Sequence, residues 1–221
     1  MNENKRKVAL VSPTDDHTKE VIQRAIDDDV AQFECFYGDD ASAMAVECVR
    51  SGGADLLMKG AVNTDVLLRA ALDKEHGILQ PGRVMTHISV ANIPGWQRPL
   101  IFSDAAVIPH PDILQMDAIV RYTVEAARNL GIATPKVALI NFTEKENPKF
   151  PQTAVYQEIR CRAAEGLYGD VVIGGPMDVK TALDSESGTI KGIDSPVVGN
   201  ADILIFPNIE AGNTFYKTIT L

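Results

Sequence analysis

Short apolar runs alternate along the chain with segments in which apolar residues recur at helical spacing. The runs are rich in Val, Ile and Leu, which favour strands, and they lie at residues 8–11, 55–58, 100–102, 137–141, 171–173 and 203–206. Such alternation is typical of an α/β fold, in which crossover helices join parallel strands. Nearly continuous apolar strands fit this fold because helices cover both faces of the sheet.

Helices are predicted where the apolar positions repeat every three or four residues and so share one face. The longest such face comprises Ile113, Met116, Val120, Val124 and Ala127. A second comprises Val155, Ile159 and Ala163, and a shorter stripe runs over residues 21–26.

The best candidate for a domain boundary lies at residues 93–99. There, two prolines and a glycine interrupt the periodic pattern of apolar residues. This interruption predicts a first α/β domain over residues 1–93 and a second over residues 94–221. A long surface loop inside one domain explains the same residues equally well. No internal repeat or low-complexity tract argues for another division.

Ligands of open α/β sheets gather at the carboxyl ends of the strands. The residues that follow the apolar runs are small or polar with few carboxylates, and they lie at 12–14, 59–64, 103–104, 141–144, 174–176 and 207–208. This composition favours an anion-binding rim over a divalent-metal cage. Ordinary turns and helix caps use the same residue types.

The charge narrows the classes of ligand. The 221 residues include 21 Lys or Arg and 30 Asp or Glu, which gives a net charge of −9, and 45% are hydrophobic. This globular composition excludes disorder, and the negative field disfavours nucleic acid and anionic membranes as partners. An anionic ligand therefore needs a local positive site. The polar start and short first apolar run predict a cytoplasmic protein without a signal peptide or membrane span.

Residues for metal or covalent chemistry are sparse. Cys35, Cys48 and Cys161 lie far apart within predicted elements, so we expect reduced, buried thiols. The four histidines lack ligand spacing, and no metal site is predicted. The motifs of P-loop, dinucleotide-binding, nucleophile-elbow and zincin proteins are absent.

Residues 56–69 are the most informative stretch. A strand ends at Lys59, Gly60 permits a tight turn, and Thr64 can cap a helix that carries Arg69 on its second turn. The N–H groups at a helix start attract anions, and the two cations add positive charge nearby. Taken alone, the pattern favours an ordinary capped helix with a solvated arginine.

Further blocks follow this stretch in order, at residues 73–77, 86–87, 103–106, 131–138, 144–149 and 174–176. The most specific are Lys191-Gly192-Ile193-Asp194-Ser195-Pro196, residues 200–213 and Tyr216-Lys217. Each block alone is weak, but their collinear order is specific. In these blocks the chain resembles the phosphate acetyl/butyryl-transferase family.

The resemblance implies an enzyme that exchanges a short-chain acyl group between CoA and inorganic phosphate, with butyryl-CoA or acetyl-CoA as substrate. It implies no metal and no cofactor, since CoA is a substrate or product. It further implies two α/β domains with largely parallel sheets, flanking helices and a cleft between them, similar to the isopropylmalate dehydrogenases. A homodimer formed through the second domain is expected.

The same resemblance assigns roles to residues of the first domain. Thr64 and Arg69 match positions that line the phosphate and CoA site. We expect Arg69 to be the catalytic clamp, because its planar fork matches phosphate oxygens. Lys59, Gly60 and Asn63 are expected to bind substrate beside Thr64.

Two residues of the second domain are also expected to bind substrate. Asn213 follows Gly212 at a predicted helix start and either lines the cleft or caps its own helix. Lys217 is a candidate contact to CoA phosphates, and a solvated role explains it as well.

One departure from the family concerns the end of the sequence. Family members continue past the Tyr-Lys block with a segment that completes the first domain and carries a Ser-Arg-x-Asp loop of the catalytic site. We therefore expect a truncated or incomplete sequence whose proton-transfer group lies in the missing segment. The alternatives are a noncatalytic CoA- or phosphate-binding remnant and a nicotinamide-dependent hydroxy-acid dehydrogenase of related fold.

Overall fold

The computed structural model describes residues 5–96 and 98–220. The chain divides into two compact units between Arg83 and Val84. The expected boundary after residue 93 therefore lies inside the second unit rather than between the units. The reason is that strand β4, Ser89–Ala91, pairs antiparallel with β5, Leu100–Ser103, so the Pro- and Gly-containing segment connects two strands of one sheet.

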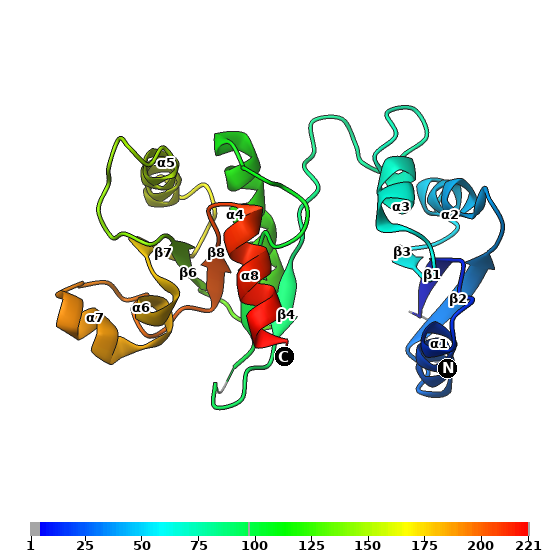
Figure 1. Cartoon of the computed structure of the whole chain (residues 1–221), viewed down its shortest axis with the longest axis horizontal. Coiled ribbons are helices and arrows are strands. Elements are labelled where there is room, and N and C mark those ends of the chain that lie inside the picture. Colours follow the sequence, from blue (N-terminus) through cyan, green and yellow to red (C-terminus); the bar gives the residue numbers. More distant parts are fainter. Residues whose placement is uncertain (1–4, 97, 221) are drawn as a thin grey trace. The chain divides into compact units, whose positions relative to one another are not determined.

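The first unit has a three-stranded sheet in the order β2-β1-β3, with both pairings parallel (Figure 1). Its elements are β1 (Arg6–Val11), α1 (Asp16–Asp27), β2 (Ala31–Phe36), α2 (Ala41–Arg50), β3 (Leu56–Lys59) and α3 (Thr64–Ala71). The buried cluster is small and consists of Ala9, Val11, Phe36, Ala41, Ala45, Ala54 and Leu67. The central strand β1 contributes residues of its apolar carboxyl-terminal half to this cluster.

The predicted apolar stripe of residues 21–26 does form a helix, α1, but that helix buries no residue. Val21 is 41% exposed and Ile26 is 48% exposed. The stripe is therefore not part of the buried cluster among the described residues of the first unit. The spacing predicted the helix, but whether its face is covered depends on the elements around it.

The second unit has a five-stranded sheet in the order β4-β5-β8-β6-β7, parallel except for β4. Its remaining elements are α4 (Ile113–Asn129), β6 (Lys136–Ile140), α5 (Gln152–Ala164), β7 (Val172–Met177), α6 (Val179–Leu183), α7 (Ser185–Lys191), β8 (Ile203–Ile205) and α8 (Ile209–Ile219). The predicted fold class, α/β with largely parallel sheets and flanking helices, is confirmed.

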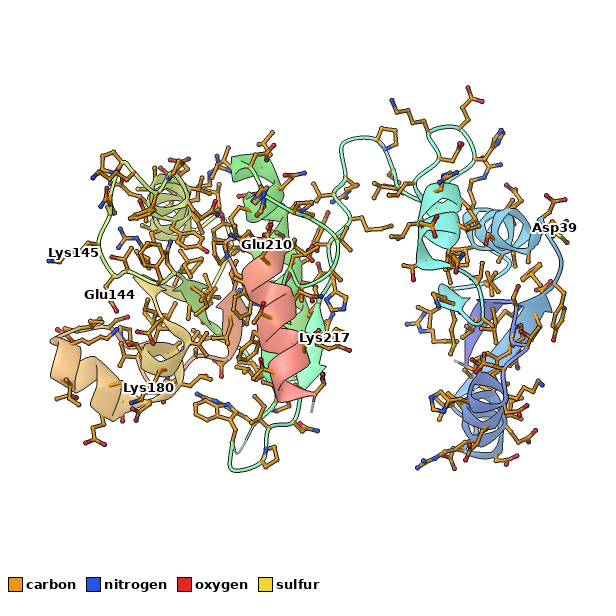
Figure 2. All side chains as sticks on the ribbon, in the orientation of Figure 1. Asp39, Glu144, Lys145, Lys180, Glu210 and Lys217 are labelled. Carbon is orange, nitrogen blue, oxygen red and sulfur yellow. The ribbon has the colours of Figure 1, made fainter. Side chains whose placement is uncertain are left out.

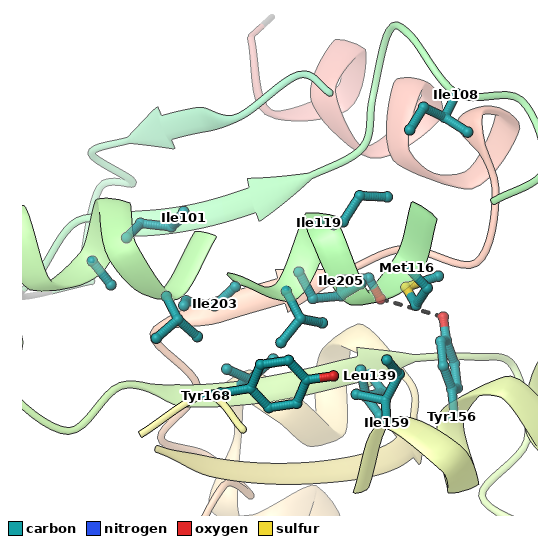
Figure 3. Packing of buried hydrophobic residues seen from close by; sticks show 14 residues of the cluster. Ile101, Ile108, Met116, Ile119, Leu139, Tyr156, Ile159, Tyr168, Ile203 and Ile205 are labelled. Atoms are coloured by element: carbon teal, nitrogen blue, oxygen red, sulfur yellow. Dashed lines mark hydrogen bonds between the residues drawn. The ribbon is translucent and has the colours of Figure 1, made fainter. Parts of the chain in front are cut away.

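Successive residues of β5 belong to different cores, because side chains of a strand alternate between the two faces of a sheet. Ile101 packs in one cluster with α4 and α5, whereas Leu100 and Phe102 pack in another with α6 and α8. Figure 3 shows the first cluster, with the hydrogen bond from the Tyr156 hydroxyl to the Ile205 carbonyl of β8. The same hydroxyl lies 2.8 Å from the Ile140 carbonyl of β6. Helices thus cover both faces of this sheet.

The three cysteines are free, but the expectation that they are buried is wrong. Cys35 and Cys161 are exposed and Cys48 is half-buried. Cys35 lies on β2, an edge strand of the first sheet, and Cys161 lies on the outer side of α5. An apolar sequence neighbourhood did not reveal which side of each element faces solvent.

Candidate functional site

A tight turn follows β3, as the sequence predicted. A Cβ on Gly60 would lie 2.5 Å from the Val11 carbonyl oxygen and 2.7 Å from that of Ser12. The backbone N–H groups of Gly60 and Ala61 donate to these same two oxygens at 2.8 Å. Only glycine allows this close approach, so the end of β3 is held against the end of β1.

Helix α3 begins one residue earlier than expected. Asn63, with an extended backbone, is the N-cap, and Thr64 is the first helical residue. The prediction that Thr64 caps the helix is therefore wrong, because the Asn63 carbonyl already accepts the first helical bonds from Val66 and Leu67. The Asn63 side chain makes no cap hydrogen bond, and both residues are exposed.

Lys59 lies over the same loop. Its ammonium donates to the Gly60 carbonyl at 3.2 Å, and the residue is exposed. The structure therefore brings Lys59, Gly60, Asn63 and Thr64 together in one β3–α3 loop. This loop joins a positive charge to the start of a helix, an arrangement that suits an anion.

Arg69 occupies a different place on α3, about 7.5 Å along the helix axis from Thr64. Its side chain is 84% exposed, and its nearest carboxylate, on Asp65, is 4.0 Å away. Arg69 lines a pocket of about 520 Å³ between α2 and α3, which none of the loop residues lines. Four carboxylates also line that pocket, those of Asp39, Asp40, Glu47 and Asp73. Figure 2 marks Asp39.

In the second unit, Asn213 lies in the middle of α8 rather than at its start. Its side-chain amide donates to the Ala105 carbonyl at 2.9 Å, while Asn208 caps the helix by accepting from the Ala211 N–H. The alternative that Asn213 caps its own helix is therefore wrong. Lys217 is exposed on the same helix, with its ammonium 5.1 Å from the centre of the Tyr216 ring (Figure 2).

The loop after β5 is organised by a carboxylate to which the sequence had assigned no role. Asp104 is 2% exposed and accepts from the Thr86 hydroxyl at 2.8 Å and from the N–H groups of Ala106 and Val107 at 2.8 and 2.9 Å. The sequence feature that could have indicated this role is the position of Asp104 directly after a predicted buried strand. These bonds hold the loop on which Asn213 rests.

A second pocket, of about 530 Å³, lies where β6, β7 and β8 end. Its walls include Val179, Phe206 and Phe215, and Asp178 and Glu210 are the acidic residues that line it. Asn141, directly after β6, is 6% exposed, and its side-chain oxygen has no hydrogen-bond partner among the described residues. The sequence predicted that Asn141 lies at a strand end but assigned it no function.

In the described ranges, no group of three or more His, Cys, Asp or Glu side chains is arranged to hold a metal ion. In those same ranges, no helix is both long and apolar enough to span a bilayer.

Solved phosphotransacylases share this fold. A branched-chain phosphotransacylase from Enterococcus faecalis superposes with a TM-score of 0.82 at 24% identity, covering 97% of this chain and 84% of that one. A phosphotransacetylase from Streptococcus pyogenes gives 0.80 at 21% identity, covering 96% and 80%. At these identities the likeness concerns the fold.

Sequence comparison assigns the family. Residues 5–221 match the family model described as phosphate acetyl/butaryl transferase. The chain is 33% identical to a phosphate acetyltransferase from Thermotoga maritima, over 97% of this chain and 81% of that protein. It is 39% identical to a phosphate butyryltransferase from Clostridium acetobutylicum, over 81% of this chain and 60% of that protein. The chain belongs to this family of transferases, as the collinear motifs predicted.

Proposed function

We propose that this protein exchanges a short-chain acyl group between CoA and inorganic phosphate. In the forward direction an oxygen of hydrogen phosphate attacks the thioester carbonyl of butyryl-CoA or acetyl-CoA. A carbon–oxygen bond forms, the carbon–sulfur bond breaks, and the phosphate proton passes to the leaving thiolate. The products are the acyl phosphate and CoA, and the balance requires no resident cofactor.

The observation that carries this proposal is the family match over residues 5–221, which includes the segment from Lys59 to Arg69. The chemistry needs two anions held together and an oxyanion stabilised as phosphate adds to the carbonyl. The β3–α3 loop offers a lysine, a Gly turn and the exposed N–H groups at the start of α3. These groups suit phosphate oxygens.

Arg69 is proposed as the catalytic clamp. Its guanidinium is exposed and only weakly engaged by Asp65, so it is available to a ligand at little cost. A planar fork of N–H donors matches phosphate oxygens in pairs, which a lysine cannot do. Asn213 and Lys217 are proposed as substrate-binding residues. Among the described ion pairs, none joins the Lys217 ammonium to a carboxylate, and this ammonium lies beside the Tyr216 ring.

The protein is further proposed to act in the cytoplasm as a homodimer formed through its second unit. The family match over residues 5–221 supports the dimer. Light scattering on the eluting protein tests the dimer, since a monomer mass across the working concentration range contradicts it.

Phosphate-dependent release of thiol from butyryl-CoA or acetyl-CoA tests the proposed reaction. The assay is run on the product of the complete reading frame that encodes these residues, with and without phosphate. We expect thiol release that rises with phosphate and forms acyl phosphate in equal amount. Absence of release from both esters, or release independent of phosphate, contradicts the transferase activity.

A further inference from the structure

The pocket at the ends of β6, β7 and β8 has a character different from that of the β3–α3 loop. Its surface is mainly apolar, with walls supplied by Val179, Phe206, Ala211 and Phe215. Phe206 and Phe215 stack with ring centres 5.2 Å apart and both contact Phe102 of the core, so this wall is anchored. Its volume, about 530 Å³, lies within the range of about 300–1,000 Å³ that small-molecule sites occupy.

Asn141 adds a polar group to this apolar pocket. The residue is 6% exposed, and its side-chain oxygen has no partner in the part of the chain that the structure describes. A buried, unpaired amide oxygen is costly, by about 1–3 kcal/mol, so such groups are expected to meet a ligand or water. Rotation of the carboxamide exchanges its oxygen and nitrogen, so it can accept from an amide N–H or donate to a carbonyl.

The charges around the pocket limit what can enter. The titratable residues lining it, Asp178 and Glu210, are both acidic. Asp178 already meets the Lys191 ammonium, and Glu210 is exposed near the start of α8, with its carboxylate 3.8 Å from the His110 imidazole. A phosphate group entering here would approach a carboxylate with no cation among the lining residues. The pocket therefore suits a neutral, largely apolar group that carries one hydrogen-bonding function.

We propose that this pocket binds the hydrocarbon chain of the acyl-CoA, with Asn141 hydrogen-bonded to the polar group next to that chain. The inference rests on the proposed transferase function and adds to it the site that sets acyl chain length. The position agrees with the rule that ligands of parallel sheets lie at the carboxyl ends of the strands. Val179 and Thr214 then limit how long a chain fits.

The experiment compares kcat/KM over a series of straight-chain acyl-CoA esters from acetyl to pentanoyl. Thr214→Leu fills the pocket from α8, and we expect the butyryl-to-acetyl ratio of kcat/KM to fall about tenfold or more, the usual effect of one or more methylenes. Thr218→Leu is the matched control, because Thr218 is exposed on the same helix outside the pocket. Val179→Ala enlarges the pocket and should shift the ratio toward longer chains.

Asn141→Leu provides a second readout that a purely structural residue would not give. Because the amide oxygen has no partner among the described residues, the urea midpoint followed by Trp96 fluorescence should stay level or rise. Binding of butyryl-CoA should weaken about tenfold, the effect of losing one hydrogen bond of ordinary strength. A large loss of stability overturns the inference, since it would mean that the amide serves the fold.

The outcomes distinguish a failure of the acyl-pocket inference from a failure of the proposed transferase function. If the unsubstituted protein releases no thiol in response to phosphate, the proposed function fails. If it does, but Thr214→Leu and Val179→Ala leave the chain-length series unchanged, only the acyl-pocket inference fails.

Discussion

The two units of this protein differ in how completely they pack, although both are α/β. In the first unit, four of the seven residues of the buried cluster are alanines, and α1 buries nothing. In the second, two clusters rich in Ile, Leu and Phe cover both faces of the sheet. Because stabilisation grows with the apolar area buried, the second unit should be the more stable. The proposed phosphate ligands Lys59, Thr64 and Arg69 therefore belong to the thinly packed unit.

The two units also contain a matched pair of helix caps. Asp15 caps α1 and bonds to the N–H and hydroxyl of Thr18, and Asp178 caps α6 and bonds to Thr181 in the same way. The second cap differs in one respect, since Asp178 also meets Lys191 of α7. The same Asp-x-x-Thr pattern is thus an isolated cap in one unit and a tertiary contact in the other.

The largest expected effect concerns activity in the first unit. Arg69→Ala should raise the barrier of the phosphate-dependent reaction by about 2–4 kcal/mol, because one charge-assisted contact to the developing charge is lost. The unfolding midpoint should not move, since the side chain is exposed. Steady-state thiol release at varied phosphate measures the effect.

Arg24→Ala is the control for that measurement. Arg24 is also 84% exposed, lies in the same unit, and has a comparable partner, Asp28, at 3.7 Å. Equal turnover in the Arg24 and Arg69 variants would contradict the role assigned to Arg69.

The next effect concerns stability in the second unit. A Cβ on Gly212, in the middle of α8, would lie 2.1 Å from the Asp104 carbonyl oxygen. Gly212→Ala should therefore lower the free energy of unfolding by about 3 kcal/mol, near the upper end for overpacking. A glycine with free space in a helix would behave oppositely and gain about 1 kcal/mol.

Urea unfolding followed by Trp96 fluorescence measures this, because the only tryptophan of the chain lies in the second unit. Thr218→Ala on the same helix controls for altered helix propensity. A Gly212→Ala midpoint at or above that of the unsubstituted protein would show that α8 does not approach the β5 loop this closely.

A smaller effect depends on pH. Partial burial raises the pKa of Asp178, but hydrogen bonds from Lys191 and Thr181 outweigh burial and lower it to about 2. A carboxyl whose pKa is lower in the folded state stabilises the fold above its unfolded pKa of about 4 and loses that contribution as pH falls toward 2. We expect about 1–2 kcal/mol to be lost over this interval.

Asp178→Asn should flatten this part of the pH dependence, because the amide keeps the cap but does not titrate. Unfolding midpoints of the second unit at pH 5, 4 and 3 provide the measurement. A variant that loses stability with acid as steeply as the unsubstituted protein would assign the effect to other carboxylates.

The smallest effect is expected for the matching cap of the first unit. Asp15→Asn should leave stability unchanged, because asparagine caps a helix as well as aspartate does and Asp15 is not paired with a cation among the described ion pairs. Circular dichroism during urea unfolding follows the helices of both units. A marked loss would indicate that the charge of Asp15 has a partner beyond these contacts.

Most of the strands could be predicted because a buried strand contains consecutive apolar residues. β1, β5, β6 and β8 lie within one or two residues of the predicted runs. β2 and β4 were not predicted, because neither contains a run of three consecutive apolar residues, whereas the edge strands β3 and β7 overlap such runs and were predicted. A strand without an apolar run is recognised by its partner strand, which the local sequence does not contain.

The candidate site could also be predicted only where its structure depends on neighbouring residues in the sequence. The Gly60 turn is local, so its residue could be read from the chain, whereas the cap at Asn63 was misplaced by one residue. The contacts of Asn213 with Ala105, and of Asp104 with Thr86, join residues far apart in sequence. The pocket around Asn141 likewise needs three strand ends and α8 together.

By itself, the sequence determined the family, the α/β class, the main strands and the turn at Gly60, because periodicity, collinear motifs and glycine's unique backbone freedom are local properties. Only the tertiary structure decided which apolar faces are covered, which aspartate meets a lysine and which amide oxygen lacks a partner within residues 5–96 and 98–220. Those outcomes depend on burial and on contacts between distant segments, which exist only once the sheets have formed.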